Sequence, residues 1–152
     1  VEEVIVNCRN EQREALADIL PDDVRFAIDR VPDSGPVAGI RDGCRMARGD
    51  WTFITACDMP FLETDVIEPL FEHADDDGAV PRVEGHPVPL AAVYDTTVAV
   101  ESAELTLQTG SKAVMEFLAK LSPVFVADSV PPQAIEDIDT QAELRTARSR
   151  SA

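Results

Sequence analysis

The chain is poor in basic residues. Its 152 residues include 13 Lys and Arg against 29 Asp and Glu, and Lys112 and Lys120 are the only lysines. A surface this acidic repels phosphate backbones and anionic lipids, so we expect neither nucleic acid nor a membrane as a partner. Acidic excess with little lysine is also typical of halophilic proteins, because strong salt screening removes the cost of self-repulsion.

Long apolar runs are also missing. No run approaches the roughly 20 apolar residues that a membrane-spanning helix needs, and no charged-then-apolar leader precedes the first expected strand. We therefore expect a cytoplasmic protein. The length of 152 residues and the hydrophobic content of 45% favour a single globular domain over residues 1–152.

Cysteine is scarce and glycine is absent from the N-terminal part. Cys8, Cys44 and Cys57 form no CxxC pair, and an odd number cannot all be paired in disulfides, which indicates buried free thiols in a reducing compartment. With only two histidines and no ligand spacing, a zinc site is not expected. Because the first glycine is Gly35 and the first lysine is Lys112, no glycine-rich phosphate loop with a lysine precedes them.

Apolar strands alternate with helical stretches along the first half of the chain. This order predicts an α/β fold with a largely parallel sheet, and two extended segments around residues 84–87 predict an antiparallel element in the second half. The strands are expected at residues 4–6, 24–28, 51–56, 79–83, 88–94 and 124–126. The helices are expected at residues 11–20, 36–48, 64–71, 98–107 and 111–121, and from residue 140.

Polar residues follow three of the expected strands. Asn7, Asp29 and Asp58 each come directly after one, and ligands of open parallel sheets bind beyond the carboxyl ends of the strands. For each residue alone, a helix cap or a turn former is the alternative. Asp58 is the strongest of the three candidates. Pro60 prevents the strand from continuing, which leaves the carboxylate of Asp58 alone at the end of the strand. Such a carboxylate suits Mg²⁺.

A glycine-containing segment, DSGPVAGI, leads into the second expected helix. Gly35 and Gly39 would let a ligand approach the backbone, and the helix N-terminus favours an anion or a polar ring edge. A loop that needs glycine only for its dihedral angles is the alternative.

Four further residues are weaker candidates. Asp137 and Asp139 share one face of an extended segment and either complete a metal site or are solvated. His86 is either a substrate contact or a structural residue in a turn. Lys112 lies at an expected helix start, where a cation is unfavourable, which hints at an anionic substrate group.

A series of segments resembles one family, in the same order along nearly the whole chain: VIVNCRN, AIDR, SGPVAGI, FITACDMPF, GHPVPLAAVY, TGSKAVMEFL and DIDTQAEL. The family is that of the MobA-like nucleotidyltransferases, the molybdenum cofactor guanylyltransferases. The resemblance implies a three-layer α/β/α, Rossmann-like nucleotidyltransferase sheet. It also implies an enzyme that transfers GMP from GTP to molybdopterin and releases pyrophosphate.

The resemblance also implies roles for the candidate residues. The nucleotide would be bound by Asn7, Asp29, Gly35, Pro36, Ala38, Gly39 and Asp58. Asp58 would be the catalytic residue and a ligand of Mg²⁺, joined by Asp139 and Asp137 where the family has an asparagine. His86 and Lys112 would contact the acceptor.

One family feature has no counterpart in this chain. The family begins with a strand and a glycine-rich loop whose arginine and lysine grip the triphosphate, so the first segment here corresponds to the family's second strand. Either this sequence is a fragment of a longer chain that has this strand and phosphate loop, or the protein lacks them. Without them, we expect the chain to be inactive. The exposed sheet edge would then be covered by a partner chain or by a second copy in a homo-oligomer.

Two other functions stay open at this point. The same fold would serve a transferase that uses CTP with the same pterin, or GTP with a corrinoid or deazaflavin precursor. A non-catalytic binding module that retains the nucleotidyltransferase sheet is the alternative from a different class, and it predicts weak or no nucleotide binding.

Overall fold

A computed structural model describes most of the chain, namely residues 2–29, 35–127, 131–135, 138, 140, 143 and 145. The described residues form a mixed α/β structure with parallel and antiparallel strand pairs, as predicted. The chain divides into two compact units. The first comprises Val1–Thr52 and Tyr94–Ser122, and the second comprises Phe53–Val93 and Pro123–Ala152.

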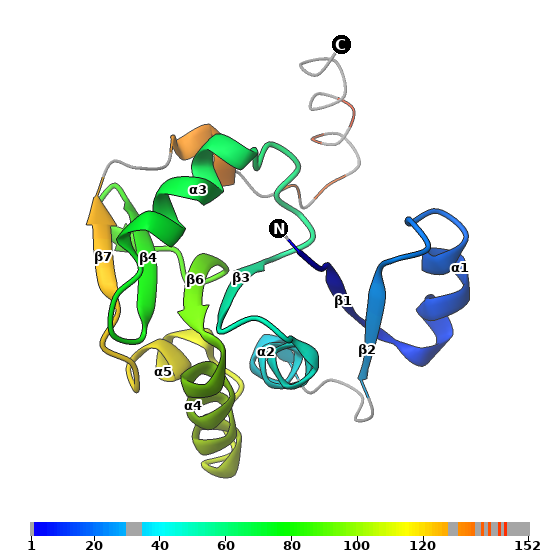
Figure 1. Ribbon diagram of the computed structural model, residues 1–152, viewed down its shortest axis with the longest axis horizontal. Coiled ribbons are helices and arrows are strands. Elements are labelled where there is room, and N and C mark those ends of the chain that lie inside the picture. The colour runs from blue at the N-terminus through cyan, green and yellow to red at the C-terminus, as the bar shows by residue number, and fades with distance from the viewer. Residues whose placement is uncertain are drawn as a thin grey trace. The chain divides into compact units, whose positions relative to one another are not determined.

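The first unit combines a two-stranded parallel sheet with helices. The sheet pairs β1 (Ile5–Arg9) with β2 (Arg25–Asp29), and the connection between them carries a 3₁₀ turn, η1 (Asn10–Gln12), and a short helix, α1 (Arg13–Ala17). Figure 1 shows these strands side by side. The other helices of the unit are α2 (Gly35–Met46), α4 (Thr96–Gln108) and α5 (Val114–Leu118).

Helix α2 is the centre of the first unit. It packs against β1, β2 and α4. Its buried side chains recur at helical spacing, at Val37, Ala38, Ile40 and Cys44. The buried face of α4 is made of small residues, which lets the two helices approach each other closely: Ala99, Ser102, Ala103 and Thr106. The packing of α2 therefore fixes the elements around the candidate site.

Most of a five-stranded sheet belongs to the second unit. Its order is β3 (Trp51–Thr55), β6 (Ala91–Asp95), β4 (Gly78–Val83) and β5 (His86–Pro87), with β7 (Val124–Ala127) paired in parallel to β4. Helix α3 (Thr64–His73) contacts β4 and β7 (Figure 1), and the 3₁₀ turn η2 (Pro132–Ile135) follows β7. One buried cluster joins these elements: Leu70, Ala79, Val93 and Val126.

The predicted antiparallel element is the hairpin of β4 and β5. Val83 pairs with His86, so the connecting turn holds only Glu84 and Gly85, at φ values of 52° and 82°. Two successive positive φ values are those of the tight turn that matches the twist of a hairpin. His86 and Pro87 are therefore strand residues, whereas the sequence suggested that they belong to the turn.

The cysteines were predicted to be buried free thiols, which is right for two of them. Burial raises the pKa of the Cys44 thiol to about 11, and burial also raises the pKa of Cys8. The prediction is wrong for Cys57, which is free but exposed. The reason is that β3 ends at Thr55, so Cys57 lies in the following turn and not in the core.

Within the part of the chain that the structure describes, no helix has both the length and the apolar character needed to cross a membrane.

A polar contact ties the start of the chain to the end of α2. The Glu3 carboxylate accepts hydrogen bonds from the Arg48 backbone N–H and from Arg25 Nη1, both at 2.6 Å, and Arg25 Nη1 also donates to the Met46 carbonyl at 2.7 Å. The bond from the Arg48 N–H, followed by that from Arg25, lowers the pKa of Glu3. Because the folded-state pKa is lowered, the stabilisation is complete above the ordinary value of 4.5 and is lost as pH falls through the folded-state pKa.

We therefore expect Glu3→Gln to lower the melting temperature at neutral pH. The difference from the wild type should shrink as pH falls below 4.5, because the wild-type carboxylate is then protonated as well. Thermal melts followed by circular dichroism between pH 3 and pH 7 test this expectation. Glu2→Gln, an exposed neighbour with the same change of charge, is the control and should show no such pH-dependent difference.

Candidate functional site

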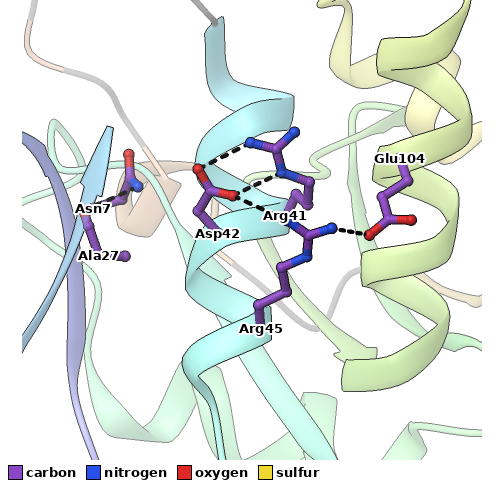
Figure 2. A network of polar contacts seen from close by, with 6 residues as sticks. All are labelled: Asn7, Ala27, Arg41, Asp42, Arg45 and Glu104. Carbon is purple, nitrogen blue, oxygen red and sulfur yellow. Dashed lines mark hydrogen bonds and ion pairs between the residues drawn. The ribbon is translucent and has the colours of Figure 1, made fainter. Parts of the chain in front are cut away.

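Asn7 is held between β2 and α2. The sequence placed it just after a strand, but β1 continues to Arg9, so Asn7 lies within the strand, opposite Ala27. Asn7 Nδ2 donates a hydrogen bond to the Ala27 carbonyl at 3.2 Å (Figure 2). A Cβ atom built on Gly39 of α2 would lie 3.0 Å from Asn7 Oδ1. Glycine at position 39 therefore leaves room for the amide of Asn7, which stays exposed to a ligand.

Gly35 begins α2 and contacts a distant segment. Its φ of +75° is a conformation that favours glycine, and a Cβ built there would lie 3.0 Å from Lys112 Cβ. The sequence placed Lys112 at a helix start, which is wrong, because α5 begins only at Val114. The preceding Ala113 is extended, with φ −78° and ψ 123°, so no helical turn forms around Lys112. Lys112 thus lies in the loop between α4 and α5, against the first residue of α2.

A cavity of about 650 Å³ opens beside β2 and α2 in the first unit. Of the predicted site residues, it brings together Asp29 at the end of β2, Ala38 of α2 and Lys112. The rest of the wall comes from β2, from one face of α2 and from the end of α4: Phe26, Ala27, Ile28, Arg41, Asp42, Arg45, Met46 and Leu107. Asp29 is half-buried and Lys112 is exposed, so the wall carries charges of both signs that solvent or a ligand can reach.

Two arginines of this wall were not foreseen. Arg41 donates to Asp42 from Nε at 2.7 Å and from Nη2 at 3.1 Å, and this pairing raises the pKa of the Arg41 guanidinium. Arg45 lies 4.0 Å from the same carboxylate and also pairs with Glu104 of α4 (Figure 2). Their helical spacing from Ala38 is the signal that places them on one face of α2. Together with Lys112, they place three cationic side chains in the cavity wall, beside the carboxylates of Asp29 and Asp42.

Asp58 belongs to the second unit, in the turn that follows β3. Its Oδ1 atom is buried and has no hydrogen-bond partner among the described residues. A buried carboxylate oxygen without a partner is unfavourable unless a cation or a donor reaches it. This oxygen is therefore open to a cation or a hydrogen-bond donor. The sequence placed the carboxylate at the tip of the strand, whereas β3 already ends at Thr55 and Asp58 lies in the turn beyond it.

The main chain of Asp58 is tied to the C-terminal part of the chain. The Ile138 N–H donates to the Asp58 carbonyl at 2.9 Å. In the sequence Ile138 is flanked by Asp137 and Asp139, the two other predicted metal ligands, which both lie outside the described residues. Among the residues that are described, no group of three or more His, Cys, Asp or Glu side chains could hold a metal ion.

His86 has a structural position. It is exposed in the two-residue strand β5, opposite Val83 in the hairpin. Of the two alternatives left open for this residue, the hairpin position fits the structural one. Asp58 and His86 belong to the second unit, whereas Asn7, Asp29, Gly35, Pro36, Ala38, Gly39 and Lys112 belong to the first.

Comparison with known protein families gives one match that covers most of the chain. Residues 1–124 match the MobA-like NTP transferase domain. A probable molybdenum cofactor guanylyltransferase from Natronomonas pharaonis is 36% identical, with 99% of this chain and 78% of that protein aligned. A probable molybdenum cofactor guanylyltransferase from Haloferax mediterranei is 35% identical, with 96% of this chain and 70% of that protein aligned.

Solved structures with the same fold are nucleotidyltransferases and related proteins. Molybdopterin-guanine dinucleotide biosynthesis protein A from Archaeoglobus fulgidus has a TM-score of 0.74 at 22% identity, over 97% of this chain and 77% of that chain. The 2-C-methyl-D-erythritol 4-phosphate cytidylyltransferase from Thermus thermophilus has a TM-score of 0.70 at 15% identity, over 99% of this chain and 83% of that chain. At these identities the likeness concerns the fold.

Proposed function

The chain belongs to the MobA-like NTP transferase domain family, and from this premise we propose that it transfers GMP from GTP to molybdopterin, with release of pyrophosphate. The names of the relatives support this reaction, since they are called molybdenum cofactor guanylyltransferases. The structural observation that carries the proposal is the buried Oδ1 of Asp58, which has no hydrogen-bond partner among the described residues and is suited to the metal ion that such a transfer uses.

The first unit contributes the nucleotide contacts in this proposal. The exposed Asn7 amide and the half-buried Asp29 carboxylate are hydrogen-bonding groups for the ribose and base. Gly35 and Gly39 carry no Cβ at two positions near the start of α2, where the N–H groups of the helix favour a phosphate or a polar ring edge. The cations of the cavity wall, Lys112 above all, would balance the negative charge of the phosphates.

Asp58 is the proposed ligand of Mg²⁺. Its lone buried oxygen fits the preference of Mg²⁺ for one or two protein carboxylates, with water and substrate phosphates filling the remaining positions. Asp137 and Asp139 are the proposed additional ligands, because Ile138 between them is bonded to the Asp58 main chain. The bound ion would neutralise charge on the phosphates of the substrate.

The proposed reaction is a displacement at the α-phosphorus of GTP. An oxygen of the acceptor's terminal phosphate forms the new bond, and the bond from the α-phosphorus to the pyrophosphate oxygen breaks. The protein has little covalent chemistry to perform in such a transfer, so its residues act by holding the reacting groups in place and by stabilising charge. In the turn that carries Asp58, the ring of Pro60 restricts the backbone and the Ile138 N–H donates to the Asp58 carbonyl, and both would help to hold the side chain in place.

Calorimetric titration of the chain with GTP, CTP and ATP, with and without Mg²⁺, tests the proposal. The buffer contains molar KCl, because the chain carries a formal net charge of −16. We expect binding that requires Mg²⁺ and prefers GTP. A preference for CTP would mean that the nucleotide substrate is CTP and that the proposed type of reaction still holds. The absence of binding by all three nucleotides would contradict the proposal.

A further inference from the structure

A second cavity, of about 300 Å³, lies within the second unit between the N-terminal end of α3 and η2. Figure 1 shows η2 beside α3. The floor of the cavity is apolar: Val66 of α3 and Ala134 of η2 are buried against each other, and Leu62 packs on them. Phe61 is half-buried in the wall. An apolar floor with an aromatic side chain beside it favours a flat ring as the ligand.

The rim of this cavity is polar and acidic. Glu63 and Asp65 are both exposed, and Gln133 of η2 adds an amide. Glu63 occupies the N-cap position of α3, but its side chain makes no capping hydrogen bond. The N–H groups of the first turn of α3 are therefore not capped by it, and such groups are natural donors to a carbonyl oxygen. The rim thus combines acceptors for N–H groups with donors for a carbonyl.

We propose that this cavity binds the pterin ring of the acceptor, an inference that rests on the proposed function. A pterin carries a 2-amino-4-oxopyrimidine edge, whose N–H groups would donate to Glu63 and Asp65 and whose oxygen would accept from the start of α3. The ring would stack on Phe61. The two carboxylates repel phosphate, so the ring enters the cavity and the phosphate of the acceptor stays outside it.

The cavity and Asp58 are built by the same two segments. Phe61 follows Asp58 in the loop between β3 and α3, and the Leu62 N–H reaches the Met59 carbonyl at 3.5 Å within that loop. On the other side, η2 supplies Ala134, and Ile138 a few residues later is bonded to the Asp58 carbonyl. A ring in the cavity is thereby anchored by the same loop that carries the proposed metal ligand.

Guanine has the same 2-amino-4-oxopyrimidine edge, so the experiment compares the two ligands. The probe is 6-hydroxymethylpterin, whose fluorescence is followed as it is titrated with the full chain, and GTP with Mg²⁺ is titrated calorimetrically on the same samples. The variants are Phe61→Leu and the double variant Glu63→Gln/Asp65→Asn. Glu72→Gln, an exposed residue near the other end of α3, is the matched control.

We expect the wild type and Glu72→Gln to bind the pterin saturably and both cavity variants to bind it at least about tenfold more weakly, with GTP affinity unchanged. Wild-type protein that does not bind the pterin, or cavity variants that bind it normally, would overturn the inference. So would a parallel loss of GTP affinity, because the cavity would then hold the nucleobase. Pterin binding without GTP binding would contradict the proposed function and leave the pterin site standing.

Thermal melting curves of all variants show whether each of them is folded. Glu63 and Asp65 are exposed, so the double variant should fold even if Phe61→Leu does not.

Discussion

Replacing Asp58 with Asn is expected to lower the rate of GMP transfer about 10²- to 10³-fold, measured as pyrophosphate release from GTP in the presence of the acceptor. The amide keeps the shape of the side chain and loses the charge that would hold Mg²⁺. The buried Oδ1 atom has no partner within the described residues, so little else in the site compensates for that loss. The assay uses a chain form with measurable wild-type activity.

The same variant should not be less stable in the absence of metal. Asp58→Asn removes a negative charge whose buried Oδ1 has no partner in the described part of the chain, so its melting temperature without Mg²⁺ should equal or exceed that of the wild type. Mg²⁺ with GTP should raise the melting temperature of the wild type and not that of the variant. Asp22→Asn makes the same change of charge at an exposed position and should behave like the wild type.

This pair of results separates a metal ligand from a structural carboxylate. A structural Asp58 would lose stability on substitution and would show no dependence on Mg²⁺. Transfer that continues at the wild-type rate in Asp58→Asn would contradict the role proposed for this residue.

Gly39→Ala is expected to weaken GTP binding about tenfold, although alanine is the better helix former. The added Cβ would lie 3.0 Å from Asn7 Oδ1 and 3.4 Å from its Cγ, which is a tight contact, so the amide has to shift. A shift weakens the hydrogen bond from Nδ2 to the Ala27 carbonyl and moves Asn7 from the position proposed for the nucleotide. A displaced hydrogen bond of this kind is worth roughly 1 to 2 kcal/mol, which corresponds to a factor of about 5 to 30 in affinity.

Gly43 of the same helix supplies the matched control. A Cβ built there meets nothing within 4 Å, so Gly43→Ala should stabilise the protein by up to about 1 kcal/mol and leave GTP affinity unchanged. Calorimetric affinities and urea unfolding of the two alanine variants give the comparison. Asn7→Ala alone, and combined with Gly39→Ala, completes a double-mutant cycle in which the losses should not add, because both changes act through Asn7. Equal affinity in Gly39→Ala and the wild type would contradict the arrangement.

The two variants test different units of the chain. Gly39 and Asn7 belong to the first unit and report on the nucleotide contacts, whereas Asp58 belongs to the second and reports on the metal. A nucleotide that binds through Asn7 alone should lose affinity in Gly39→Ala with or without Mg²⁺. The Mg²⁺-dependent part of the affinity should disappear in Asp58→Asn.

The sequence alone determined the type and order of the main elements. The spacing of apolar residues located the strands and helices, because side chains return to the same face at a different interval in a helix and in a strand. The end of β3 was also located by its apolar pattern. A backbone that needs glycine, which Gly35 has at the start of α2, was one of the two alternatives that the sequence left open for that segment. The ordered motifs also led to the family, which the match over residues 1–124 confirms.

Some boundaries depended on contacts that local patterns do not contain. Strand β1 runs through Asn7 to Arg9 because β2 offers paired backbone groups as far as Asp29. Helix α5 is limited to Val114–Leu118, although the surrounding residues favour a longer helix, because Ala113 is extended and Gly110 has a φ of +81°. Strand pairing thus decides where β1 ends, and the backbone angles of the preceding loop decide where α5 begins.

The details of the candidate site were decided by the tertiary structure. The sequence did not reveal that Gly39 makes room for Asn7 or that Arg41 and Arg45 share a cavity wall with Lys112. It also did not reveal that Asp58 Oδ1 is buried with no partner among the residues that the structure describes. Each of these facts joins residues from different elements. Local preferences extend over a few residues, whereas burial and pairing depend on which distant side chains the fold brings to the same place.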